Sequence, residues 1–66
     1  ENQVDLAIKL LEKSVQLKPN YEDARYALTL FYEQEGRKDD ARQQLEYILE
    51  KINPQSQKAK EKLEKL

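Results

Sequence analysis

The only glycine of the chain, Gly36, separates two segments in which apolar residues recur at helical spacing. The stripe before it consists of Ala24, Ala27, Leu28, Phe31 and Tyr32, with Tyr26 and Leu30 on a second edge. The stripe after it consists of Ala41, Leu45, Ile48, Leu49 and Ile52. Residues three and four positions apart share one face of an α-helix. Because glycine adopts the left-handed conformation at a helix end without steric cost, residues 24–52 predict a helical hairpin.

Two further segments flank this hairpin and also have helical periodicity. The segment before it carries a stripe of Val4, Ala7, Ile8, Leu11 and Val15, which Leu6, Leu10 and Leu17 widen to a second side. The segment after it, residues 55–66, has only Ala59, Leu63 and Leu66, so we expect a frayed, mostly solvated helix. Short connections force neighbouring helices to be antiparallel. The predicted fold is all-α, with about four antiparallel helices.

The expected helix ends depend on proline and asparagine. Pro19 ends the first helix, because proline has no amide hydrogen and restricts the residue before it. Asn20 is expected to be the N-cap of the second helix. Asn53 is expected to cap the last helix, with Pro54 at its first helical position.

The first segment repeats the second half of the hairpin at a constant separation, which we call the repeat offset. The matching pairs are Asp5 with Asp39, Ala7 with Ala41, Leu11 with Leu45, Glu12 with Glu46, and Val15 with Leu49. The match then shifts by one residue. At the repeat offset Pro19 predicts a proline at position 53, but the proline is at position 54 (Pro54). The third helix or the turn after it therefore contains about one extra residue.

This pattern resembles the tetratricopeptide repeat, a helix-turn-helix unit of about 34 residues, a length that agrees with the repeat offset. The residues that carry the resemblance are Ala7, Leu11, Ser14, Pro19, Leu28, Tyr32, Gly36, Ala41, Leu45 and Pro54. It covers essentially the whole chain and implies one domain, residues 1–66. Residues 4–18 would be the second helix of a partial repeat and residues 20–54 a complete repeat. Residues 55–66 would be the first helix of a following repeat or a terminal capping helix.

Three residues depart from the pattern of that family. Arg25 stands where a large apolar residue, often Trp, is usual. Thr29 replaces Gly or Ala, and Ile48 replaces a small residue. These departures affect the expected spacing of the helices more than the resemblance itself.

The resemblance implies a protein-interaction scaffold with no enzymatic activity. Its concave face would be lined by Asp23, Tyr26, Leu30, Glu33 and Gln34. Tyr26 and Leu30 would then contact a peptide or helix of a partner protein, since tyrosine is favoured at interaction hot spots. In the alternative interpretation both residues pack against a preceding helix or the terminal helix. A clamp for a C-terminal carboxylate is not expected on this face, and Lys58 and Lys62 are interpreted as a solvated charged surface.

The length of the chain limits its stability. A chain of 66 residues has a marginal core, and repeat arrays need about three units. The side of residues 4–17 that would meet an absent helix should be exposed. We expect self-association (a homo-oligomer) through this side, or marginal stability. The alternative function is a capping or oligomerisation segment without a ligand groove of its own.

The residues present argue against catalysis, cofactors and metals. There is no cysteine or histidine, which excludes disulfides and the usual zinc sites. Ser14 and Ser56 have no nearby base, and no glycine-rich phosphate loop is present. The carboxylates of Asp39 and Asp40, like the Glu33–Glu35 pair, are better explained by solubility and helix-end charge than by a cation site.

The charge balance argues against two further classes of partner. Twelve basic and 13 acidic residues give a net charge of −1, which provides no strong field for nucleic acid or an anionic membrane. The longest apolar runs are far shorter than the ~20 residues of a membrane span. The chain has no initial methionine and no signal-peptide pattern, so we expect a soluble fragment of a longer protein. The absence of cysteine is compatible with several compartments and favours the cytoplasm only slightly.

Overall fold

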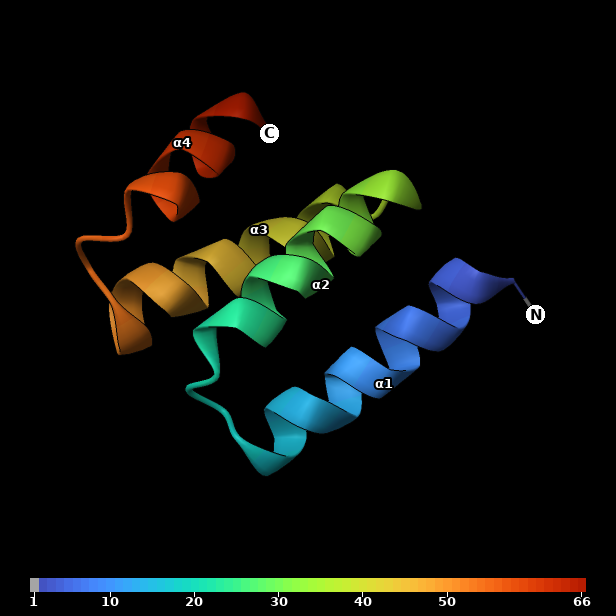
Figure 1. Ribbon diagram of the computed structural model, residues 1–66. Helices are drawn as coiled ribbons and strands as arrows, with labels where there is room; N and C mark the ends of the chain where they lie inside the picture. Colours follow the sequence, from blue (N-terminus) through green and yellow to red (C-terminus); the bar gives the residue numbers. More distant parts are fainter. Residues whose placement is uncertain (1) are drawn as a thin grey trace.

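The computed structural model describes residues 2–66 as an array of antiparallel helices. The elements are α1 (Gln3–Leu17), α2 (Glu22–Gln34), α3 (Lys38–Tyr47), the π-helix η1 (Ile48–Ile52), which continues α3, and α4 (Gln57–Lys65). Helix α2 packs between α1 and α3, and α4 packs on α3 and η1, so α1 and α4 lie at opposite ends of the array (Figure 1). The molecule measures 35 × 27 × 15 Å. Among the described residues there is no strand, and the prediction of an all-α fold is confirmed.

The core consists of two clusters that join each helix to its neighbour. The first lies among α1, α2 and α3 and contains Ile8, Val15, Ala24, Leu28, Tyr32 and Ala41. The second lies among α3, η1 and α4 and contains Leu45, Ile48 and Ala59, with Tyr26, Leu49, Ile52 and Leu63 packed against it. Helix α4 is therefore anchored by a fully buried alanine, although a frayed helix was expected.

Gly36 ends α2 as the sequence predicts. Its φ angle is 75°, in the left-handed region that glycine tolerates best. The amide of Gly36 donates to the carbonyl of Glu33 at 3.0 Å, and the amide of Arg37 donates to the carbonyl of Tyr32 at 2.8 Å. These two bonds form a Schellman motif and satisfy carbonyls that the helix end leaves unpaired.

The expected cap of α2 is wrong by one residue. The N-cap is Tyr21, which makes no side-chain capping bond. The amide of Tyr21 instead donates to the carbonyl of Lys18 at 3.0 Å, which places Asn20 in the turn before the helix. There the side-chain oxygen of Asn20 accepts a long hydrogen bond of 3.5 Å from the Tyr47 hydroxyl.

The expected start of α4 is also wrong. Pro54 lies in a turn rather than at the first helical position, and the N-cap is Ser56, whose hydroxyl oxygen accepts from the amide of Ala59 at 3.3 Å. Asn53 stabilises the turn, because its side chain accepts from the amide of Gln55 at 3.1 Å. The backbone carbonyl of Asn53 accepts from the amide of Ser56 at 3.0 Å. This bond is equivalent to the one from the amide of Tyr21 to the carbonyl of Lys18 before α2.

The extra residue predicted from the sequence lies inside η1. At the end of α1 the amide of Lys18 donates to the carbonyl of Ser14, four residues back, at 2.8 Å. At the end of η1 the amide of Asn53 donates to the carbonyl of Ile48, five residues back, at 2.7 Å. Ile48 matches Ser14 at the repeat offset, whereas Asn53, the counterpart of Lys18, lies one position beyond it. The wider turn of η1 therefore contains the extra residue. Beyond η1, each residue is separated from its counterpart in the preceding repeat by one residue more than the repeat offset.

The structure accounts for the two unusual residues of α2. The guanidinium of Arg25 lies over the Tyr47 ring, 3.6 Å from its centroid, so a planar cation occupies the place of a large apolar side chain. The same group donates to the carbonyl of Pro19 and to the side-chain oxygen of Gln44, both at 3.0 Å. Thr29 is fully buried, and its hydroxyl donates to the carbonyl of Arg25 at 3.0 Å, so no polar atom of its side chain is left unpaired.

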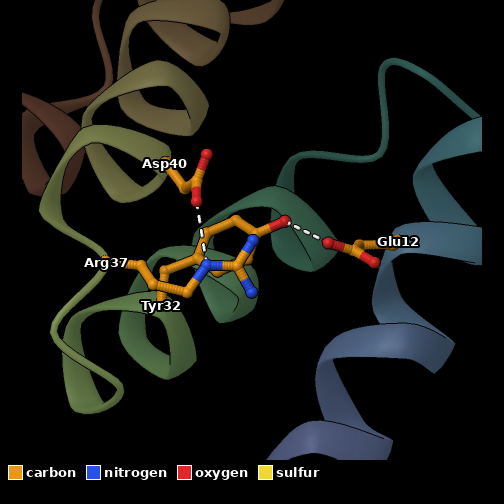
Figure 2. Close-up of polar contacts among 4 residues, drawn as sticks. All are labelled: Glu12, Tyr32, Arg37 and Asp40. Carbon is orange, nitrogen blue, oxygen red and sulfur yellow. Dashed lines mark hydrogen bonds and ion pairs between the residues drawn. The ribbon is translucent and has the colours of Figure 1, made fainter.

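A cluster of four polar residues links α1, α2 and the start of α3. The hydroxyl of Tyr32 donates to the Glu12 carboxylate at 2.6 Å. The Arg37 guanidinium lies over the Tyr32 ring at 4.5 Å and donates to Asp40 at 2.9 Å (Figure 2). Burial, followed by the hydrogen bond and charge of Glu12, raises the pKa of Tyr32 well above its usual value of 10.0. This cluster therefore joins α1, α2 and the start of α3.

We expect the Tyr32→Phe variant to lose about 1 kcal/mol of unfolding free energy at neutral pH, the usual contribution of one hydrogen bond. A second effect appears at alkaline pH. An unfolded tyrosine releases its proton near pH 10.0, whereas folded Tyr32 keeps it. The contribution of Tyr32 is therefore fully present below pH 10.0 and falls above it by up to about 1.4 kcal/mol per pH unit. Urea titrations on both sides of this pH measure the loss.

The matched control is Tyr47→Phe, which removes a hydroxyl with only a 3.5 Å hydrogen bond. The alkaline loss should be smaller in Tyr32→Phe than in the wild type or in Tyr47→Phe. An identical pH dependence in all three proteins would show that Tyr32 does not cause the loss.

Candidate interaction surface

The side of α2 next to α4 contains the five residues expected to line a binding face. Tyr26 is half-buried and packs against the second core cluster. The Lys58 ammonium lies 4.7 Å from the centroid of its ring, at a distance where a cation is attracted to an aromatic face. Tyr26 therefore contributes to the packing between α2 and α4.

Glu33 forms the second connection between these helices. Its carboxylate pairs with the Lys62 ammonium at 2.7 Å, and the two side chains are 30% and 23% exposed. The expectation of a solvated charged surface is therefore wrong for Lys62, whereas Lys58 is exposed even though its ammonium lies over the Tyr26 ring. Lysine stems are long enough to lie along a neighbouring helix, and α4 lies close enough to α2 for both ammonium groups to reach it.

Leu30 is the apolar residue of this side that remains open. It is 43% exposed, and Asp23 and Gln34, on the same side of α2, are exposed as well. We define the inner face as Asp23, Tyr26, Leu30, Glu33 and Gln34. The sequence treats Tyr26 and Leu30 as a pair, but the structure separates them, because Tyr26 is covered by α4 and Leu30 is not.

A second open surface lies on α1. Leu6, Leu10 and Leu17 are 47%, 69% and 74% exposed, as expected for a helix whose outer side has no neighbour. At the end of α1 a shallow hollow of about 200 Å³ is lined by Ser14, Leu17, Lys18 and Tyr21. Both surfaces are therefore sites where another molecule has room to bind.

The acidic and serine side chains considered above for metal binding and catalysis have other surroundings in the structure. No group of three or more acidic side chains among residues 2–66 is placed to hold a metal ion. The hydroxyl of Ser14 donates to the carbonyl of Leu10, and that of Ser56 caps α4, so both serve the backbone. Within the same residues, no helix has the length and apolar character needed to cross a membrane.

Comparison with known proteins identifies the family. No curated protein and no solved structure matches the chain significantly. The family model of the tetratricopeptide repeat matches residues 1–65. Repeats of this kind typically form non-enzymatic modules for protein–protein interaction. The hairpin of α2 and α3, the turn at Gly36 and this match together show that the chain belongs to the tetratricopeptide repeat family.

Proposed function

We propose that the chain binds a peptide or helix of a partner protein on the inner face. The observation that supports this is the exposure of Leu30, 43%, next to the two contacts that join α2 to α4. An apolar side chain surrounded by polar groups resembles the centre of an interface, where one anchor contributes most of the affinity and polar neighbours exclude water. Asp23 and Gln34 offer hydrogen-bonding groups on the open side of Leu30.

The Leu30→Ser variant tests this proposal. Because Leu30 is partly exposed, the variant should fold, yet it should bind a peptide selected on the wild-type chain at least about tenfold more weakly, or about 1.4 kcal/mol. The peptide would come from a displayed random library, and its affinity would be measured by calorimetry. Tyr26→Ser is a poorer test, since it also removes packing against α4.

Leu10→Ser is the matched control, because it makes the same change on the exposed outer side of α1, away from the inner face. It should leave the affinity unchanged. Equal binding of the selected peptides to the wild type and Leu30→Ser, with loss in Leu10→Ser, would contradict the inner face as the binding site.

The alternative, a structural capping segment, is supported by the outer side of α4. Lys60 and Glu64 occupy the positions that Arg25 and Thr29 hold in α2, once the extra residue of η1 is counted. Thr29 is fully buried, so a further helix packed on α4 in the same way would bury the Glu64 carboxylate. Burying an unpaired carboxylate is strongly unfavourable. Helix α4 is therefore suited to end a repeat array, and this role is compatible with binding at the inner face.

A further inference from the structure

The side of α4 that borders the inner face continues it with the opposite charge. Lys58 and Lys62 reach α2 from this side. At about 100° per residue, Lys65 lies within about 20° of Lys58 around the helix axis. We define the facing side of α4 as Lys58, Glu61, Lys62 and Lys65. Most of its residues are basic, whereas every charged residue of the inner face is acidic, so the combined surface is acidic over α2 and basic over α4.

Lys65 differs from the other two lysines of the facing side. Those two contact α2, one through an aromatic ring and the other through a carboxylate. The acid one turn before Lys65 is Glu61, and its carboxylate accepts from the side-chain amide of Gln57 at 3.1 Å. Within residues 2–66, Lys65 takes part in no ion pair, and its side chain is exposed. Its ammonium is therefore accessible to a carboxylate of another molecule.

Leu30 and Lys65 occupy equivalent positions on α2 and α4, once the extra residue of η1 is counted. Leu30 is 43% exposed although α2 has neighbouring helices on both sides, so this position points away from the packed sides. The ion pair of Glu33 and Lys62 lies between the two helices, three residues after Leu30 and three residues before Lys65. An apolar side chain and an ammonium therefore stand on the two sides of a pair without net charge.

The spacing of the two helices suits an extended peptide. Helices whose side chains touch lie about 8–10 Å apart, and side chains of α2 and α4 touch at two places. An extended chain advances about 3.3 Å per residue. About three residues therefore separate a side chain over α2 from one over α4. A peptide with an apolar residue over Leu30 would place the residue about three positions away beside Lys65.

The charges decide which end of such a peptide lies over α4. A carboxylate over α4 meets the ammonium of Lys65, whereas a carboxylate over α2 meets the acidic side chains of the inner face, among them the exposed Asp23. Opposite charges across an interface favour binding, and like charges oppose it. The acidic residue of the peptide therefore belongs on the α4 side of its apolar residue.

We propose that the segment bound at the inner face is an extended peptide with a large apolar side chain over Leu30 and an aspartate or glutamate about three residues away, beside Lys65. This inference rests on the proposed function and adds the chemistry and conformation of the bound segment. The group that pairs with Lys65 is a side-chain carboxylate within the peptide.

The first test selects peptides from a displayed random library on the wild-type chain, on Lys65→Glu and on Lys60→Glu. Peptides selected on the wild type should be enriched in aspartate or glutamate about two to four residues from their large apolar residue. Lys65→Glu should select lysine or arginine there instead, because the charge of the site is reversed. Lys60 is exposed on the opposite side of α4, so Lys60→Glu is the matched control and should keep the acidic preference.

The second test measures one peptide selected on the wild type by calorimetry, together with a version whose acidic residue is changed to the amide. Both peptides carry an amidated C-terminus. The acidic peptide should bind the wild type about three- to fivefold more tightly, the effect of one exposed ion pair. This difference should disappear in Lys65→Glu, remain in Lys60→Glu, and vanish for the wild type at about 1 M salt, where exposed charges are screened.

The outcomes separate this inference from the proposed function. Weaker binding to Leu30→Ser, together with equal affinities for the two peptides, would overturn the inference and keep the inner face as the binding site. Acidic residues enriched about seven residues from the apolar one, the spacing that a helix with a rise of 1.5 Å would need, would assign the site to a helical segment. Loss of binding on amidation would assign Lys65 to a C-terminal carboxylate.

Either of these last two results would also overturn the inference. Equal binding to Leu30→Ser and the wild type, or the failure of the library to yield any peptide that binds the wild type, would overturn the inference and the proposed function together.

Discussion

The Leu28→Ala variant is expected to be largely unfolded at room temperature. Leu28 has no exposed surface and lies in the cluster that joins α1, α2 and α3. Truncating a buried leucine costs about 2–5 kcal/mol, from lost burial and the cavity left behind. The core of a chain this small rarely supplies more than about 3–5 kcal/mol. Far-ultraviolet circular dichroism during urea titration measures the loss.

Leu10→Ala is the matched control for this variant, because it removes the same atoms from a side chain that is 69% exposed. Its unfolding free energy should stay within about 0.5 kcal/mol of the wild type. If both variants unfolded at the same urea concentration, the assignment of Leu28 to the core would be wrong.

The second large effect concerns the π-helix and compares two single-residue deletions. Deletion of Lys51 removes one residue from η1. The bond from the Asn53 amide to the Ile48 carbonyl then spans four residues instead of five and becomes an ordinary α-helical bond. The packing of α4 can be kept, so the unfolding free energy should change by less than about 1 kcal/mol, well within the range of single substitutions.

Deletion of Gln43 should instead abolish folding, although Gln43 is exposed. It rotates every later residue of α3 by about 100° relative to the earlier ones. Leu45 and Ile48, both fully buried, would turn away from the core. Circular dichroism and thermal unfolding of the two deletions give the comparison. Equal loss in both would show that the π-helix is required for the fold.

The sequence predicted the features of the fold that depend on periodicity. Stripes of apolar residues report which side of a helix is buried, and Leu28, Ala41 and Leu45 are fully buried as that pattern requires. Gly36 was equally predictable, because the left-handed conformation at this turn favours one residue type. The slip between Pro19 and Pro54 indicated the extra residue, but several positions between them were compatible with it. Only the backbone hydrogen bonds located it in η1.

Features that depend on distances between helices were not predictable. Asn20 and Asn53 are good capping residues by type, yet Tyr21 and Ser56 hold these positions because the preceding turns fix where each helix begins. Lys58 and Lys62 alternate with other charged and polar residues and therefore resemble a solvated surface. Their contacts with α2 depend on the approach of a helix that is distant in sequence, with all of α3 and η1 between them. For the same reason the sequence did not distinguish Tyr26 from Leu30.

The arrangement of the helices has a consequence for the speed of folding. Each helix packs mainly on the helices next to it along the chain, and α1 and α4 lie at opposite ends of the array. No large loop must therefore close before the first contacts form. Proteins with such local contacts fold within about microseconds to milliseconds. The hairpin of α2 and α3, which shares buried residues with both neighbours, is where we expect the folding nucleus, with α1 and α4 joining it independently.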